Sequence, residues 1–331
     1  MGFWQRLSRL EDRVEPVRVG LIGNYTKERE LLERAYKQNQ EIKVIFSLGF
    51  EEMGRVIKAD VEVVEIFAGA ENQADIAMRY LEQGVNVSLG MPVSVELSSI
   101  EEVKRLAEIQ GKLVRVRNHC LYYEPYQRAR EILAKEKIGY PTMLKLVVKR
   151  NSAGMENFDM GRWILEKESD YLSLAEYFYG RIEKVFMMTG SGGDVPGSIL
   201  LGLKFKTRHR FGYLLADFSP GLQIRNFSEP VFRQVWASGT AGVLMINRGE
   251  GQLWRTPVLL LRAKNYAHSY EDLKDSWEEI YSAMVNDVIN VLRRGREMVS
   301  GISLAERGVR IALSAVKSFK DGKEVLIDTE E

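Results

Sequence analysis

The side chains best suited to acid–base chemistry are three histidines and a single cysteine, and one histidine stands where parallel sheets bind ligands. Asn118 and His119 closely follow a short apolar run, Leu113–Val116, that reads as a buried strand. Open α/β sheets bind their ligands beyond the carboxyl ends of such strands. An imidazole titrates near neutrality, so His119 is a candidate general base. Its other interpretation is a hydrogen-bonded packing residue.

The other polar candidates are dispersed along the chain. His209 lies in a basic turn, Lys206–Arg210, which we expect to be exposed, and His268 is expected in a loop before a long C-terminal helix. Lys149 and Arg150 end a predicted strand and could face a sugar or an anion, although a solvated edge is the commoner arrangement. Three separated histidines and one cysteine do not make a metal site, so none is predicted.

Composition restricts the class of protein. A chain of 331 residues favours two domains, and a net charge of +1 argues against nucleic acid or an anionic membrane as partner. Cys120 is the only cysteine, which excludes an intramolecular disulfide. The sequence has neither an apolar run long enough to span a bilayer nor a signal-peptide pattern. We therefore expect a cytoplasmic protein.

The amino-terminal part alternates apolar runs with helical patterns, which is typical of a Rossmann-type, doubly wound parallel sheet. The predicted strands are Val17–Ile22, Ile42–Leu48, Val61–Phe67, Val85–Leu89 and Leu113–Val116. The predicted helices are Lys27–Gln38, Asn72–Gln83, Ser98–Gly111 and Glu124–Lys135. The third helix is expected to open with a capping box of Ser98 and Glu101.

The pattern changes at Gly139–Pro141, after which strands follow one another without crossover helices. This predicts an α+β domain with a large, mostly antiparallel sheet. Its expected strands are Met143–Lys149, Lys184–Met188, Ile199–Phe205, Gly212–Phe218, Gln234–Ala237, Val243–Ile246 and Val258–Leu261. Three helices are expected in this part: one over Asp170–Tyr179, one carrying Leu273 to Val291 on its apolar face, and one opening with Ser303 and Glu306 and ending at Gly322.

These patterns divide the chain into three segments. Residues 1–16 form a helical extension, which either docks on a partner subunit or packs on its own domain. Residues 17–140 form the dinucleotide-binding type of domain, and residues 141–331 form the second domain, whose last helices return toward the first. No linker, repeat or low-complexity segment interrupts this arrangement.

The order of elements, together with local phrases, resembles the Gfo/Idh/MocA oxidoreductases, which include glucose–fructose oxidoreductase and inositol dehydrogenase. The phrases are Val17–Gly23, Leu81–Val87, Lys137–Thr142, Gly239–Leu244 and the tail from Arg293 to Val325. The resemblance implies a nicotinamide cofactor, NAD or NADP, on the first domain and a sugar-like substrate over the second sheet. It also implies dimers or tetramers formed through that sheet.

A pyrophosphate approaches the backbone closely only over a glycine-rich turn. Gly23 fills the first glycine position of the family turn, but the second falls on Tyr25 and the third on Glu28. A bulky ring and a negative charge both oppose a dianionic ligand, although Lys27 and Arg29 would partly offset the charge.

The remaining cofactor contacts of the family also depart from its pattern. Ser47 stands where an acid usually meets the adenosine ribose, and Gln73 where a histidine follows the Thr-Pro-Asn loop. The cofactor-binding positions that the resemblance gives are Gly23, Asn24, Tyr25, Ser47, Ala68, Gly69 and Pro92. We therefore expect a nicotinamide cofactor to bind weakly or not at all.

The catalytic positions are altered in the same way. The lysine of the family's Glu-Lys-Pro loop is replaced by Met91, while Pro92 is kept. A thioether accepts no proton, and loss of a positioned acid–base group costs about 10²–10⁴-fold in rate. The aspartate and histidine expected on a second-domain helix correspond to Glu166 and Asp170, and Asp170 is equally well explained as a helix N-cap.

Three hypotheses follow. The first is a catalytically degenerate family member, a pseudoenzyme that binds a sugar-like metabolite or a partner subunit. The second is an active NAD(P)-dependent oxidoreductase that uses His119, Asp170 or a substrate group as its base. The third is non-redox chemistry, such as elimination or hydrolysis, in the same cleft. Concerted loss of the cofactor contacts and the lysine favours the first.

Overall fold

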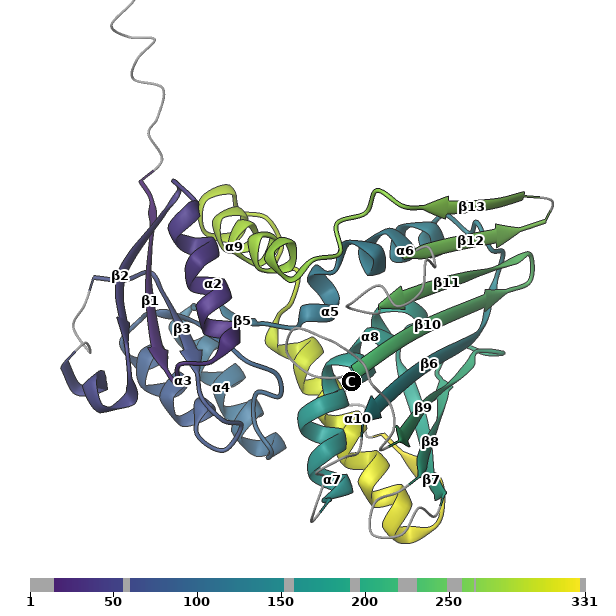
Figure 1. Ribbon diagram of the computed structural model, residues 1–331. Coiled ribbons are helices and arrows are strands. Elements are labelled where there is room, and N and C mark those ends of the chain that lie inside the picture. The colour runs from purple at the N-terminus through teal and green to yellow at the C-terminus, as the bar shows by residue number, and fades with distance from the viewer. Residues whose placement is uncertain are drawn as a thin grey trace, which may run out of the picture.

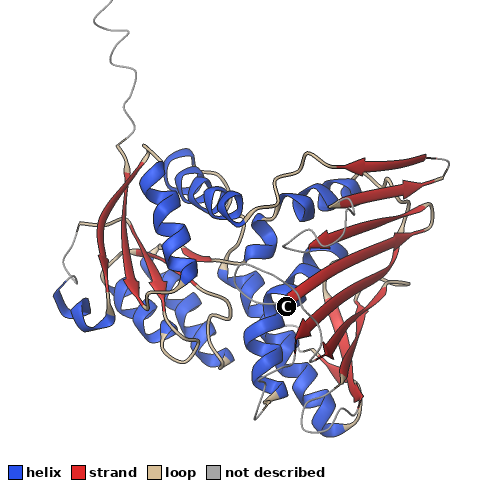
Figure 2. Cartoon of the chain, in the orientation of Figure 1, coloured by secondary structure: helices blue, strands red, loops and turns tan. Residues whose placement is uncertain are grey.

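The computed structural model describes residues 15–55, 60–151, 158–190, 197–219, 231–248, 258–264 and 266–327. Their strands form two separate sheets with helices packed against both (Figure 1, Figure 2). The fold is therefore the predicted one, a Rossmann-type parallel sheet followed by a large, mostly antiparallel sheet. The helical extension predicted over residues 1–16 lies outside the described residues except for its last two positions. The division at residue 140 stays a prediction.

The first sheet has five parallel strands in the order β2-β1-β3-β4-β5. They are β1 (Val17–Gly23), β2 (Ile42–Leu48), β3 (Val63–Phe67), β4 (Asn86–Leu89) and β5 (Val114–Val116). Helix α2 (Lys27–Gln38) packs beside α9 (Trp277–Arg294), and α3 (Gln73–Glu82) packs beside α4 (Leu97–Gln110) (Figure 1). The strand order reverses between β1 and β3, the place where such sheets bind ligands.

Gly23 ends β1 at this reversal. Its φ is +116°, and a Cβ there would lie 2.2 Å from the carbonyl oxygen of Phe67 at the end of β3. Only glycine accepts that conformation and that approach. The backbone therefore needs this glycine to close the turn, whether or not a phosphate binds there.

The second sheet has nine strands in the order β13-β12-β11-β10-β6-β9-β8-β7-β14. All neighbours are antiparallel except β6 and β9, which are parallel. The strands are β6 (Pro141–Asn151), β7 (Ile182–Gly190), β8 (Ser198–Phe205), β9 (Phe211–Ser219), β10 (Val231–Gly239), β11 (Gly242–Arg248), β12 (Leu259–Ala263), β13 (Tyr266–Tyr270) and β14 (Val325–Leu326).

Helices cover one face of this sheet and, within the described chain, leave the other face open (Figure 2). They are α6 (Glu124–Ala134), α8 (Ser169–Tyr179) and α10 (Ile302–Asp321), with the short α5 (His119–Tyr122) and α7 (Met160–Trp163) at the junction with the first sheet. Helix α9 joins the two parts, because Arg115 of β5 donates to the carbonyl of Met284 at 2.9 Å.

The predicted capping boxes of α4 and α10 are wrong. Helix α4 begins at Leu97 after Glu96, and α10 begins at Ile302 after Gly301, each without a side-chain cap. Gly301 bridges to Arg115 of β5, so contact with the first sheet sets where α10 begins. The capping box that does form, Ser276 with Glu279 on α9, was missed.

Other local predictions also need correction. His268 lies in strand β13, opposite Leu261 of β12, and not in a loop. Asp170 lies in the first turn of α8, whose N-cap is Glu168, so it is not the N-cap residue. His209 is exposed, as predicted, and sits in a turn with φ of +60°.

Candidate functional site

The carboxyl edge of the first sheet is crossed by the side chain of Arg117, which follows β5. Its Nη1 donates to Glu65 Oε2 and to the carbonyl of Ser88, both at 2.9 Å, and its Nη2 donates to the carbonyl of Ile66 at 2.7 Å. Its Nε donates to Glu28 Oε1 in the first turn of α2, also at 2.9 Å. Arg117 is 1% exposed. One guanidinium thus spans from β5 across β4 and β3 to the helix that follows β1.

A second arginine fills the β1 side of the same edge. Arg29 is 1% exposed and donates to the carbonyl of Gly23 and, at 2.9 Å, to Ser47 Oγ at the end of β2. Its guanidinium carbon lies 4.1 Å from the centre of the Tyr25 ring, and Ser47 in turn donates to Glu33 at 2.8 Å. The position where the family recognises the adenosine ribose is therefore occupied by contacts within the chain.

Glu65 lies inside the apolar strand β3 and binds both Arg115 of β5 and Arg117, which follows β5. Its carboxylate accepts from Arg115 Nη2 at 2.6 Å and from the hydroxyl of Tyr36 on α2 at 2.5 Å. Burial raises the pKa of such a carboxyl, but Arg115 and Arg117 outweigh this and hold the pKa of Glu65 below its ordinary value. Burial and the charge of Glu65 raise the pKa of Tyr36, which stays a phenol. The network is ionic, buried and internally hydrogen bonded.

The turn after β1 offers few free groups to a pyrophosphate. The amide of Asn24 donates to Phe67 O at 2.8 Å, and the amide of Arg29 donates to Thr26 Oγ1 at 3.2 Å, so both are already satisfied. The Glu28 carboxylate lies in the same first turn, where a pyrophosphate would need positive potential. The exposed Tyr25 ring stands at the position of the second glycine.

The loop of Gly90, Met91 and Pro92, which corresponds by resemblance to a catalytic loop, is held by Gln73. Gln73, which replaces the family histidine, accepts from the amide of Gly90 at 2.9 Å and donates to the carbonyl of Pro92. The Met91 methyl lies 3.0 Å from where a Cβ on Gly308 of α10 would stand. Gln73 thus supports the loop, while Met91 packs against α10.

Ala68 and Gly69, two of the predicted cofactor-binding positions, lie in the turn after β3. The carbonyl of Gly69 accepts from the amides of Asn72 and Gln73 at 3.0 and 3.1 Å, which begins α3. Ala68 packs against the core. Neither residue offers a side-chain donor or acceptor to a ligand.

His119 lies between the two sheets at the start of α5. Its Nε2 is 3.1 Å from the hydroxyl of Tyr281 on α9 and 3.8 Å from Glu28 Oε1, and its ring meets the edge of Trp277 at 5.1 Å between centroids. Burial lowers the pKa of His119, against the opposing effect of Glu28 and Asp170. The imidazole is therefore neutral at pH 7 and able to accept a proton.

The structure separates the two carboxylates predicted on the second-domain helix. Asp170 Oδ2 lies 3.4 Å from Arg233 Nη1 and 3.6 Å from Cys120 Sγ, while its Oδ1 is buried without a hydrogen bond. Burial raises the pKa of the Cys120 thiol, so it is no nucleophile. Glu166 instead pairs with Arg162 of α7 at 2.6 Å. Asp170 and His119 lie together, and Glu166 does not join them.

Arginines at the ends of three strands of the second sheet line the same junction. Arg150 of β6 is 8% exposed and lies 3.6 Å from the fully buried Glu168. The prediction that Lys149 and Arg150 form a solvated edge is therefore wrong for Arg150, whereas Lys149 is exposed. Arg233 of β10 and Arg248 of β11 were missed by sequence reasoning. Each ends or begins an alternating apolar strand, and that position was the available signal.

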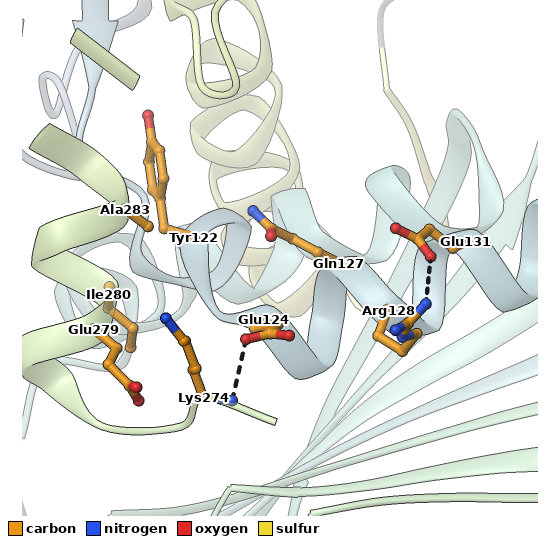
Figure 3. Close-up of a pocket in the computed structure, with 9 residues that line it drawn as sticks. All are labelled: Tyr122, Glu124, Gln127, Arg128, Glu131, Lys274, Glu279, Ile280 and Ala283. Carbon is orange, nitrogen blue, oxygen red and sulfur yellow. Dashed lines mark hydrogen bonds and ion pairs between the residues drawn. The ribbon is translucent and has the colours of Figure 1, made fainter. Parts of the chain in front are cut away.

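A separate pocket of about 260 Å³ lies where α6 meets the segment leading into α9 (Figure 3). It is lined by Tyr122, Glu124, Gln127, Arg128, Glu131, Lys274, Glu279, Ile280 and Ala283. Two of its charged side chains have partners inside the pocket: Arg128 pairs with Glu131 at 2.9 Å, and Glu124 accepts from the backbone amide of Lys274 at 3.1 Å. It contains none of the predicted catalytic residues.

Within the described ranges, no three His, Cys, Asp or Glu side chains are grouped so that they could hold a metal ion. A search of the same residues for a helix long and apolar enough to cross a membrane finds none.

By sequence, the chain matches no family model and none of the curated proteins. Its fold is similar to that of a provisionally assigned NADPH-dependent oxidoreductase from Desulfitobacterium hafniense, with a TM-score of 0.80 at 18% identity over 95% of this chain and 98% of the other. An oxidoreductase from Agrobacterium radiobacter, solved with NAD⁺, L-tartaric acid and magnesium, has a TM-score of 0.76 at 12% identity, and the match covers 94% of this chain and 98% of the other. Levoglucosan dehydrogenase, solved with NADH and L-sorbose, has a TM-score of 0.76 at 14% identity, and the match covers 95% of this chain and 100% of the other.

These matches extend over nearly the whole of each chain and establish the fold, which this chain shares with solved oxidoreductases. At 12–18% identity they do not transfer an activity. What this chain does has to be argued from its own residues.

Proposed function

We propose that this chain is a catalytically degenerate relative of the Gfo/Idh/MocA oxidoreductases, which binds a sugar-like metabolite, or a partner through it, without nicotinamide-dependent hydride transfer. The observation that carries the proposal is the Arg117 side chain, bonded to Glu28, Glu65 and two strand carbonyls across the carboxyl edge of the first sheet. That edge is where a dinucleotide would lie in this fold.

The free energy needed to open this edge supports the proposal. Breaking a buried ion pair by removing one partner costs about 3–5 kcal/mol, and the partly exposed Glu28 places the Arg117 pair at the lower end of that range. About 3 kcal/mol weakens a dissociation constant by roughly 10²-fold. A cofactor site of micromolar affinity would thereby become one of about 0.1 mM, before Tyr25 and Arg29 are displaced.

The catalytic loop gives independent support. Met91 offers neither a cation nor a proton acceptor, and its methyl is packed toward Gly308. A carbinol proton would need another base, and Asp170 is already paired with Arg233. The loop therefore keeps the shape of the family site without its acid–base group.

The second candidate is an active NAD(P)-dependent oxidoreductase with an atypical site, and His119 favours it. This imidazole is neutral, partly exposed and held by Tyr281, so it could serve as the base. Solved proteins of the same fold contain NAD⁺ or NADH. On this alternative the Arg117–Glu28 pair would open when the cofactor binds.

Calorimetric titration with NAD, NADH, NADP and NADPH separates the two candidates. The protein is first freed of any ligand that copurifies, as checked by mass spectrometry. The proposed function predicts no heat of binding up to millimolar cofactor, whereas micromolar affinity for any of the four would overturn it. A Tyr25→Gly, Glu28→Gly double variant is the matched control, because it restores the glycines and should bind more tightly than the natural chain.

We also infer a cytoplasmic homodimer or tetramer assembled through the open face of the second sheet. On that face Lys145 lies over the rings of Tyr213 and Trp236, at 6.0 and 5.5 Å, and Met188 is 46% exposed. A broad, partly apolar face of this kind is typical of an interface. Analytical ultracentrifugation of the full chain tests it, and a monomer at micromolar concentration would refute it.

A further inference from the structure

Arg248 is a buried cation, and no described carboxylate lies within ion-pair distance of it. It ends β11 and is 7% exposed, and its Nη2 is shielded from solvent. Within the described part of the chain its side chain makes no hydrogen bond or ion pair, and its guanidinium carbon instead lies 4.7 Å from the ring centres of both Tyr123 and Trp277. A charge in that setting ordinarily requires a partner of opposite sign.

The neighbouring strand makes this imbalance sharper. Arg233 of β10 is the direct cross-strand partner of Arg248, and like charges placed opposite each other are destabilising. Arg233 is compensated by Glu168 and Asp170, each at 3.4 Å. Neither carboxylate forms an ion pair with Arg248, so the charge of Arg233 is balanced and that of Arg248 on the next strand is not.

The aromatic walls do not replace an anion. Cation–π contacts recover only part of what is lost when a guanidinium leaves water. Trp277 adds a second unsatisfied donor, because its Nε1 is buried without a hydrogen bond. Asp275 precedes Trp277 closely in sequence, and the charge of Arg248 acts on its carboxylate, but Asp275 is exposed and lies beyond ion-pair distance of Arg248. Two neighbouring residues, Arg248 and Trp277, thus each have a buried donor without a hydrogen bond among the described residues.

The position of this site relative to His119 indicates what kind of molecule it would hold. The His119 ring meets the edge of Trp277, whose ring also packs against Arg248. An anionic group at Arg248 would therefore belong to a ligand whose remainder extends toward His119 and Tyr281, which are themselves 3.1 Å apart. Those two groups offer polar contacts suited to hydroxyls.

We propose that Arg248 and the Trp277 indole N–H bind the carboxylate or phosphate group of a small acidic, sugar-like metabolite, whose hydroxyls reach His119. This inference rests on the proposed metabolite-binding function and names the class of ligand. The two sources of such an anion, a sugar acid and a sugar phosphate, share the same recognition chemistry, a charge-assisted hydrogen bond to a guanidinium.

The test is calorimetric titration of the full-length protein with four probes: glucose, glucuronate, glucose 6-phosphate and inorganic phosphate. The expected result is saturable binding of glucuronate or glucose 6-phosphate, with glucose at least tenfold weaker. Which of the two binds identifies the source of the anion. Equal affinity for inorganic phosphate and glucose 6-phosphate, or no binding of either acidic probe, would overturn the proposal.

Two variants tie the binding to the residue. Arg248→Met keeps the length and apolar volume of the side chain, and loss of a charged hydrogen bond should weaken the acidic probe by about tenfold to a hundredfold. Arg296→Met removes an exposed arginine and should bind like the natural protein. Unchanged affinity in Arg248→Met would exclude the site. Because removing an unpaired buried charge should not lower the midpoint of thermal unfolding, a folded variant is expected.

The outcome is separable from that of the proposed function. Tight nicotinamide binding would refute degeneracy yet leave the Arg248 result standing, since the two titrations use different ligands. Failure of every acidic probe would refute the anion site while leaving the cofactor result untouched.

Discussion

Replacing Arg117 by methionine should destabilise the first domain strongly. The change removes donors to Glu28, Glu65 and the carbonyls of Ser88 and Ile66 while keeping an unbranched side chain of similar length. Removing one member of a buried ion pair costs about 3–5 kcal/mol. Glu65 keeps Arg115 at 2.6 Å, so its charge is not left alone and the estimate stays at about 3–4 kcal/mol rather than higher.

Urea denaturation followed by circular dichroism measures this loss, and thermal unfolding provides a second readout. At roughly 2–4 °C per kcal/mol, the midpoint should fall by about 6–16 °C. The control is Arg105→Met, which removes an exposed arginine paired with Glu102 on α4 and should leave the midpoint unchanged. In the Arg117→Met background, Glu28→Gln should add little further loss, because its partner is already gone.

This prediction would be wrong if Arg117→Met lowered the free energy of unfolding by less than about 1 kcal/mol, the range of an ordinary surface pair. It would also be refuted if Arg105→Met had an equal effect. The variant carries a second consequence, because it removes the side chain that crosses the cofactor edge. If that side chain limits dinucleotide affinity, the folded fraction of Arg117→Met should bind NAD more tightly than the natural chain.

Two further predictions concern the junction between the sheets. Gly308→Ala should lower the free energy of unfolding, measured by urea titration, by about 1–3 kcal/mol, because the new Cβ would stand 2.3 Å from the carbonyl oxygen of Ser169. The same change at an unhindered helical glycine would raise that free energy by about 1 kcal/mol. A rise for Gly308→Ala would therefore contradict the close approach. His119→Gln should flatten the pH dependence of stability just below pH 6.5. The folded state holds the pKa of His119 below its ordinary value, so the unfolded state binds the extra proton and stability of the natural chain falls as pH falls through that window. An identical slope in both proteins would show that His119 is not the group responsible.

The strands could be predicted from sequence because both faces of the parallel sheet are covered. Their residues form apolar runs such as Val63–Phe67, and burial is uniform along that strand. Helix starts were predicted less well, because a Ser-x-x-Glu pattern fits several neighbouring registers. The start of α10 is set instead by the contact of Gly301 with β5, which no local pattern contains.

The buried network was missed for a related reason. The register across β3, β4 and β5 places Glu65 opposite Ser88, and Ser88 opposite Arg115. Each residue taken alone looks like an irregularity in an apolar strand. A glutamate inside a fully buried strand must be paired, so Glu65 was the one available signal. Its partner could not be identified without the strand order.

The residues that depart from the pattern of the resembled family stabilise one another through hydrogen bonds and ion pairs. Glu28 at the third glycine position is stabilised by Arg117, and Arg29 is held by Ser47 at the ribose position. Undoing one such change would leave a charge unpaired, so a partial return to a cofactor site would cost stability. Arg248 is different, because within the described chain its side chain has no hydrogen bond or ion pair, and only the exposed Asp275 acts on it from a longer distance. The Arg248 side of the junction is therefore where we propose that a ligand binds.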